Sequence, residues 1–268
     1  MNICFCWYWD RAEQIYRLWR DGLRAAIEEI GKTNDVDIIL GKHIPEDKYD
    51  FILLWGDSNL ELIDKIKDYK SRKGICLSTD PQNFLNLSRL NVIYCESTPV
   101  YEAVRRQGIR AIKAFGTDTD FFSPTGEEKD QEYFYPATFS PWKRQSEIAY
   151  LKDRLLCIGT VQPDGKNELE ACKKEGVRLE IGYFPAEHIR NRYRRAKKVI
   201  IPAIHGSERT VLEVMSMDIL PEVTHKDNIK TYSYIQEYLD SGLKSPREFI
   251  LKNYSHQKYA KYLLRGME

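Results

Sequence analysis

The chain has 268 residues, of which 42% are hydrophobic and 30% charged, a composition typical of a folded globular protein and not of a disordered chain. A formal net charge of +1 provides no overall field toward nucleic acid or a membrane, and nucleic acid is excluded as a partner. No apolar run approaches the ~20 residues of a spanning helix. The six cysteines lack zinc-type pairing, and the first residues do not resemble a signal peptide, which predicts a reduced, cytoplasmic protein.

Short apolar segments of strand type alternate with helical segments through the first half of the chain. The expected strands are NICFC (2–6), VDIIL (36–40), DFILLW (50–55), GICLS (74–78), NVIYC (91–95) and RAIKAF (110–115). The expected helices span 12–30, 60–70 and 99–107. This alternation predicts βα units around a mainly parallel sheet.

A segment rich in Gly, Thr, Pro and charge, 116–131, then predicts a connection between domains, after which the alternation restarts. The expected strands are EYFYPATF (132–139), LLCIGT (155–160), RLEIG (178–182), KKVIIP (197–202) and ILPEV (219–223). The expected helices span 143–152, 165–176, 187–196 and 209–217, and the last 40 or so residues are helical with a break near 241–246.

The predicted fold is therefore α/β, with two doubly wound, Rossmann-like parallel-sheet domains. We place the first domain at 1–121, the second at 122–242, and a C-terminal helix that packs back on the first domain at 243–268. Open sheets of this kind bind ligands beyond the carboxyl ends of their strands.

One corner at such an end has unusual chemistry. HGSERTVLE, 205–213, follows an apolar strand and opens a helix. If Ser207 caps that helix, the amides of residues 206–209 point out of its N-terminus and form an anion site suited to a diphosphate, with Gly206 allowing close approach. The simpler interpretation is a helix start with Ser207 as N-cap and Glu208 favouring the helix dipole.

Glu213 also has two interpretations. On a helical wheel Val211, Leu212 and Met215 form the buried stripe, and Glu213 lies off it near Arg209. The first interpretation is an Arg209–Glu213 ion pair on a solvated face, although acid before base is the better order in a helix. The second is a carboxylate that accepts hydrogen bonds from the two hydroxyls of a ribose.

Four motifs together resemble those of retaining GT-B glycosyltransferases, glycosyltransferase family 4 in particular. In the family's order, they are GTDTDFFSP (116–124), YFYPATFSPWKRQ (133–145), IPAIHGSERTVLEVMSMDILPEV (201–223) and NYSHQKYAKYLL (253–264). They cover the chain from about Phe115 to its end, whereas the first domain resembles the family only in the alternation of its strands and helices.

The resemblance implies roles for individual residues. Lys143 matches the lysine that binds the donor phosphates, Arg144 beside it shares that charge, and Glu213 matches the ribose-binding glutamate. His205 replaces a family glutamate that contacts the donor sugar, and Thr138 stands near the usual phosphate-binding arginine. The implied donor-binding residues are Thr138, Lys143, Arg144, Gly206, Ser207, Glu208, Arg209, Thr210 and Glu213. The implied catalytic residues are Lys143, Arg144, His205 and Asp80, the last standing about where the family offers a histidine to the reacting sugar.

The resemblance further implies a hexosyltransferase that moves a sugar from a UDP- or GDP-sugar with retention, without metal or other cofactor. The acceptor, a glycan, a lipid or a protein, is not specified. The aromatic run CWYWD (6–10) at the end of the first strand suggests that Trp7 or Trp9, with Asp10, contacts the acceptor, although both tryptophans equally suit the core. Peripheral membrane contact stays an alternative, because related enzymes often glycosylate lipids.

Three rival functions stay open. Asp-x-Asp triplets at 35–37 and 118–120 suggest the metal site of the other large glycosyltransferase fold, GT-A, although the first triplet precedes its strand and the second falls in the connecting motif. The departures at His205 and Thr138 leave room for a nucleotide-sugar binding protein without transfer activity. A sugar-nucleotide epimerase on the GT-B scaffold is the third. The basic run at 190–198 is best explained as a solvated helix.

Overall fold

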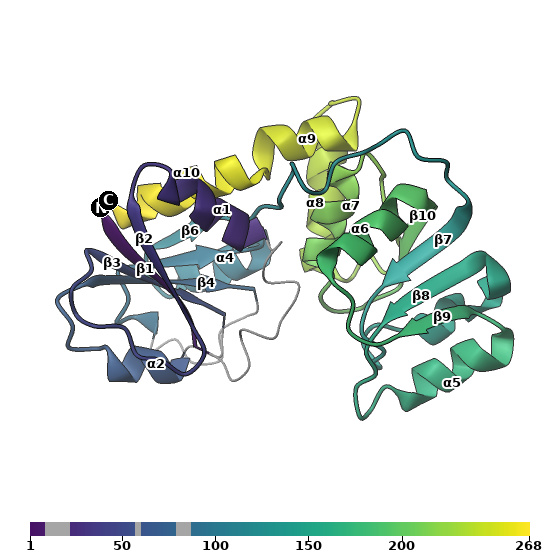
Figure 1. Ribbon diagram of the computed structural model, residues 1–268, viewed down its shortest axis with the longest axis horizontal. Helices are drawn as coiled ribbons and strands as arrows, with labels where there is room; N and C mark the ends of the chain where they lie inside the picture. Colours follow the sequence, from purple (N-terminus) through teal and green to yellow (C-terminus); the bar gives the residue numbers. More distant parts are fainter. Residues whose placement is uncertain (9–21, 57–59, 79–86) are drawn as a thin grey trace. The chain divides into compact units, whose positions relative to one another are not determined.

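The computed structural model describes residues 1–8, 22–56, 60–78 and 87–268 (Figure 1). The chain divides into two compact units: unit 1 contains Met1–Gly116 and Ser255–Glu268, and unit 2 contains Thr117–Tyr254. The sequence analysis placed the corresponding boundaries after residues 121 and 242. The backbone N–H of Thr117 donates to the carbonyl of Tyr254 at 2.9 Å, so the two ends of unit 2 are adjacent.

Unit 1 is built on a six-stranded parallel sheet with strand order β2-β1-β3-β4-β5-β6. Its strands are β1 (Asn2–Trp7), β2 (Asp35–Leu40), β3 (Phe51–Trp55), β4 (Arg72–Leu77), β5 (Val92–Cys95) and β6 (Ala111–Lys113). The central strands β1, β3, β4 and β5 are buried nearly end to end, as parallel strands covered on both faces must be. The prediction of a parallel first sheet is confirmed.

Helices cover both faces of this sheet. On one face, α2 (Leu60–Lys65) and α4 (Thr98–Arg106) pack on alternate strand residues such as Cys4, Ile52 and Ile75. On the other face, α1 (Gly22–Gly31) lies beside α10 (His256–Met267), the last helix of the chain (Figure 1). The C-terminal helix therefore packs against the N-terminal region, as predicted. The helix expected at 60–70 is shorter in the structure, because the chain turns after Lys65.

Contact between α10 and the sheet depends on a glycine. The hydroxyl of Tyr94, a fully buried side chain of β5, donates to the carbonyl of Leu263 at 2.6 Å. A Cβ atom at Gly266 would lie 2.4 Å from the same hydroxyl oxygen. No larger residue fits there unless Tyr94 moves.

Gly266→Ala is expected to lower the free energy of unfolding of unit 1 by about 1–3 kcal/mol, because overpacking forces buried side chains from their positions. Urea unfolding followed by tryptophan fluorescence measures this loss. Gly31→Ala is the matched control in the same unit, since its added Cβ would meet only Val36 at an ordinary 3.9 Å. Equal stability of the two variants would contradict the tight fit.

Unit 2 is built on a five-stranded parallel sheet with strand order β11-β10-β7-β8-β9. Its strands are β7 (Gln131–Pro136), β8 (Leu155–Gly159), β9 (Arg178–Ile181), β10 (Ala196–Ile201) and β11 (Glu222–Val223). The chain builds outward from β7 to β9 and then crosses back to form β10 and β11 on the other side of β7. This reversal makes the sheet doubly wound, as predicted.

The crossovers of unit 2 cover opposite faces of its sheet. On one face, η4 (Gln145–Arg154) packs against α5 (Lys166–Glu175). The other crossovers are α6 (Ala186–Arg195) and α7 (Glu208–Ser216), followed by α8 (Ile229–Asp240) and α9 (Pro246–Asn253), both of which pack against α7. The helix expected at 143–152 is present as η4, a 3-10 helix interrupted by a positive φ of 56° at Lys152.

Candidate functional site

The topology of unit 2 marks one place where a ligand is expected to bind. The strand order reverses between β7 and β10, so the connections that leave their carboxyl ends run to opposite faces of the sheet. A crevice opens between such connections, and open α/β sheets bind their ligands there. The two connections are residues 137–144 after β7 and residues 202–207 after β10.

Lys143 joins these two connections. Its Nζ donates to Ser207 Oγ at 2.9 Å and to the carbonyl of His205 at 3.2 Å. A backbone hydrogen bond of 3.0 Å from Ile204 N–H to the carbonyl of Trp142 ties the same loops. A lysine and the corner 205–209, which lie more than 60 residues apart in the sequence, are therefore in direct contact.

Two consecutive residues within the corner have a left-handed backbone. Gly206 has φ +71° and Ser207 has φ +91°, and α7 begins at Glu208. Ser207 occupies the N-cap position, but its side chain does not cap the helix. Both interpretations of the corner assumed a capping Ser207 side chain, and that assumption is wrong, since the hydroxyl accepts from Lys143 instead. The first N–H groups of α7 have no carbonyl within the helix and suit an anion.

A buried tyrosine holds the connection 137–144, the lysine loop, through a hydrogen bond to its backbone. Tyr135, on β7, donates from its hydroxyl to the carbonyl of Lys143 at 3.1 Å. Burial raises the pKa of Tyr135, and a hydrogen bond from the Ser207 side chain offsets only part of this rise. The phenol therefore stays neutral. The sequence analysis missed this residue, because an alternating strand pattern does not reveal which hydroxyl reaches a neighbouring loop.

The connections after β7 and β8 are packed backbone to backbone. Phe139 donates its N–H to the carbonyl of Thr160 at 2.7 Å, and Thr138 Oγ1 lies 3.1 Å from Thr160 Oγ1. A Cβ atom at Gly159 would lie 2.2 Å from the carbonyl oxygen of Ala137. Thr138, which was predicted to bind the donor, lies in the same connection as Lys143. Its position there depends on Gly159, because a larger residue would push the two connections apart.

Arg144 has a carboxylate partner within the site. Its Nη1 donates to Glu147 Oε1 at 2.6 Å, and His225 Nε2 lies 2.6 Å from Glu147 Oε2. Burial would raise the pKa of Glu147, but the hydrogen bonds from His225 and Arg144 outweigh it and lower that pKa. The ion pair offsets part of the positive charge that the resemblance assigned to Arg144.

Glu213 is buried, with 2% of its surface exposed. Its Oε2 accepts from the hydroxyl of Tyr193, a fully buried residue of α6 that also packs edge-on against Phe134 of β7. The placement of Glu213 on a solvated face is therefore wrong, because Tyr193 of α6 covers its carboxylate. Its role with ribose stays a prediction.

The remaining predicted residues lie as follows. His205 is exposed, Glu208 and Arg209 are half-buried in the first turn of α7, and Thr210 is buried. In unit 1, Trp7 is 4% exposed and its ring lies 4.1 Å from that of Trp55 at the ends of β1 and β3, so it belongs to the core. The predicted residues Trp9, Asp10 and Asp80 lie outside the residues that the structure describes.

Neither aspartate triplet forms a metal site in the described residues. Asp35 and Asp37 begin β2 and thus lie at the amino end of the sheet, where Asp37 accepts from Tyr49 at 2.8 Å. Asp118 closes a turn by accepting from the N–H of Phe121 at 3.0 Å. Within the described ranges, no group of three or more His, Cys, Asp or Glu is placed to hold a metal ion. A metal-independent site stays a prediction.

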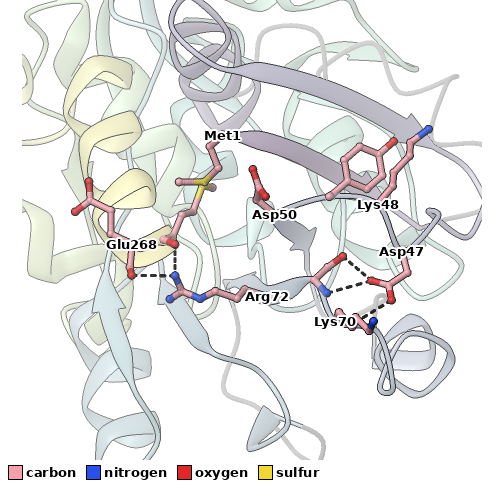
Figure 2. A pocket seen from close by; sticks show the side chains of 10 residues that line it. Met1, Asp47, Lys48, Asp50, Lys70, Arg72 and Glu268 are labelled. Atoms are coloured by element: carbon pink, nitrogen blue, oxygen red, sulfur yellow. Dashed lines mark hydrogen bonds between the residues drawn. The ribbon is translucent and has the colours of Figure 1, made fainter.

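A hollow of about 610 Å³ in unit 1 is lined by both ends of the chain (Figure 2). It lies at the amino ends of the strands, opposite the edge where such sheets bind ligands. Its polar groups are engaged in the fold: Asp47 accepts from the N–H groups of Lys70 and Ser71, which lower its pKa, and Arg72 donates to the carbonyl of Glu268. We therefore place the functional site in unit 2.

Part of the basic run at 190–198 is paired with acidic neighbours. Arg192 forms an ion pair with Glu180, and Arg195 forms one with Asp130. None of the helices in the described part of the chain is both long enough and apolar enough to cross a membrane.

No protein-family model matches the sequence, and no curated protein matches it. Solved structures are similar over its whole length. A trehalose-6-phosphate synthase, studied with bisubstrate glycomimetics of glycosyltransfer with retention, is 8% identical over 100% of this chain and 99% of its own, with a TM-score of 0.67. AviGT4, a glycosyltransferase of Avilamycin A biosynthesis, is 11% identical over 100% and 97%, with a TM-score of 0.65. The UDP-GlcNAc 2-epimerase of Methanocaldococcus jannaschii is 12% identical over 99% of both chains, with a TM-score of 0.55.

These similarities define the class of fold. The chain has the GT-B fold, with two parallel-sheet α/β domains, which glycosyltransferases share with an epimerase that acts on a nucleotide sugar. At about 10% identity the likeness shows the fold and does not assign a family.

Proposed function

We propose that the protein is a retaining glycosyltransferase that binds a nucleoside-diphosphate sugar in unit 2. The observation that carries the proposal is the contact of Lys143 Nζ with Ser207 at 2.9 Å, at the point where the strand order reverses. A cation and a helix N-terminus meet there, and both stabilise a diphosphate. The GT-B fold and the four sequence motifs support the same conclusion.

The proposed reaction breaks the bond between the anomeric carbon of the sugar and the diphosphate oxygen. An acceptor hydroxyl forms the new bond on the same face, and its proton passes to the departing phosphate. Negative charge develops on the diphosphate in the transition state, so donors fixed around it before the reaction lower the barrier. In this assignment Lys143 and the N–H groups of residues 206–209 bind that charge, with Arg144 beside them, and His205 contacts the sugar.

An epimerase is the second candidate function, because a UDP-GlcNAc 2-epimerase has the same fold over nearly its whole length. An epimerase would also bind the diphosphate at this corner, but it would change the sugar without an acceptor. A binding protein without turnover would do neither. The site geometry is common to all three, so the products of the reaction must separate them.

Isothermal titration with UDP, GDP and the corresponding monophosphates, with EDTA and with Mg²⁺, tests the proposal. We expect one diphosphate to bind at least about tenfold more tightly than its monophosphate, since a second phosphate adds contacts worth about 1.4 kcal/mol or more. We expect this affinity to persist in EDTA. Binding that requires metal would instead support a metal-dependent donor site on this fold, and absence of binding would exclude the proposed donor site.

Products are then identified by NMR with the nucleotide sugar of the preferred base. Release of the nucleoside diphosphate with retained anomeric configuration supports transfer or its hydrolytic side reaction. Inversion at a ring carbon other than the anomeric one, with no acceptor present, would identify an epimerase.

A further inference from the structure

The segment after β11 holds the corner 205–209 in place. Asn228 Nδ2 donates to the carbonyl of Ala203 at 2.9 Å and to the carbonyl of Gly206 at 3.0 Å. Thr231 Oγ1 donates to the same carbonyl of Gly206 at 2.7 Å. Asn228 is 3% exposed and Thr231 is fully buried, so both donor side chains are held inside the fold.

Asn228 makes these bonds in place of a local one. It occupies the N-cap position of α8, where asparagine is among the preferred residues because its side chain can accept from the first turn of the helix. In the structure the side chain makes no such cap and reaches back to the preceding connection. The side chain of Asn228 therefore fixes two carbonyls of the connection 202–207 and does not cap its own helix.

Fixing the Gly206 carbonyl also fixes the N–H group of Ser207. The two groups belong to one peptide unit, which is planar and trans, so they point in opposite directions. With the carbonyl held by Asn228 and Thr231, the N–H of Ser207 points away from α8. It is one of the amides that would bind the diphosphate.

We infer that Asn228 and Thr231 are positioning residues for the donor diphosphate, an inference that rests on the proposed function. They keep the peptide between Gly206 and Ser207 in its anion-binding orientation before the ligand arrives. If this peptide rotated, the carbonyl oxygen would face the phosphates and repel them. Neither residue needs to touch the ligand.

The same segment also reaches the other side of the site. His225, three residues before Asn228, bonds to Glu147, which in turn pairs with Arg144 next to Lys143. The segment 225–231 thus contacts the connection 202–207 directly and the end of the connection 137–144 through Glu147. It sets the corner relative to the lysine loop.

The test compares two substitutions at Thr231. Thr231→Val removes the hydroxyl and keeps the shape, and we expect the affinity for UDP or GDP, whichever the wild type binds, to fall about five- to tenfold. Thr231→Ser restores the hydroxyl and is expected to restore affinity to within about twofold. Isothermal titration measures the affinities, and urea unfolding without ligand measures stability.

Ser216→Ala is the matched control, because it removes a buried hydroxyl that donates to the carbonyl of Phe122 at 2.6 Å, at the far end of the same helix α7. It is expected to lower stability about as much as Thr231→Val and to leave nucleotide affinity unchanged. If Thr231→Val binds as tightly as the wild type, or Ser216→Ala weakens binding equally, the positioning role is wrong while the proposed function stands. If the wild type binds neither UDP nor GDP, both are overturned.

Discussion

Lys143→Ala is expected to weaken nucleoside diphosphate binding about a hundredfold, because it removes the charged donor that lies on the corner at Ser207. Hydrogen bonds to charged groups contribute about 1.5–3 kcal/mol each, and about 2.7 kcal/mol corresponds to this factor. The monophosphate should lose less, because it has fewer oxygens within reach of the lysine. Isothermal titration of the wild type and the variant measures both losses.

Two further variants separate the role of Lys143 from a general effect of charge. Lys143→Arg keeps the charge on a longer, planar group and should retain part of the affinity. Lys174→Ala removes an exposed lysine at the end of α5 and should change nothing. Loss of affinity in Lys174→Ala equal to that in Lys143→Ala would mean that net charge, and not the corner, binds the nucleotide.

Gly159→Ala is expected to lower the free energy of unfolding of unit 2 by about 3 kcal/mol or more. Its Cβ would lie 2.2 Å from the carbonyl oxygen and 2.7 Å from the carbonyl carbon of Ala137, and a backbone group cannot rotate away as a side chain can. The connections after β7 and β8 would have to separate, and Thr138 would move with them. Urea unfolding and titration with nucleotide measure the two consequences.

Gly126→Ala is the control for this prediction, because nothing lies within 4 Å of its added Cβ and it belongs to the same unit. It should unfold at the same urea concentration as the wild type or slightly above it. A Gly159→Ala protein as stable as Gly126→Ala would show that the two connections are not packed as closely as the structure has them.

Much of the fold was predictable because it rests on local patterns. Continuous apolar runs such as 51–55 indicate buried parallel strands. Their alternation with helical segments predicts a doubly wound α/β fold. The contact between Lys143 and the corner at Ser207 was also within reach, since motifs at the carboxyl ends of neighbouring parallel strands meet at one edge of a sheet.

Other features depend on contacts that a single sequence does not encode locally. Glu213 seemed exposed on a helical wheel, because the wheel cannot show that α6 brings Tyr193 over it. The segment at η4 was expected as a helix, but its sequence does not reveal that it is a 3-10 helix with a positive φ just before it, at Arg144, and within it, at Lys152. Asn228 resembles an ordinary helix cap, and only the tertiary structure shows where its amide is used.

The division of the chain has a consequence for biosynthesis. Unit 1 begins with the first residue of the chain, but Tyr94 of its core obtains its partner Leu263 only from α10. Unit 2, by contrast, is continuous from Thr117 to Tyr254 and has all its strands before α10 is made. On the ribosome, where domains fold as they emerge, residues 1–116 are therefore synthesised before unit 2 but gain α10 only after it.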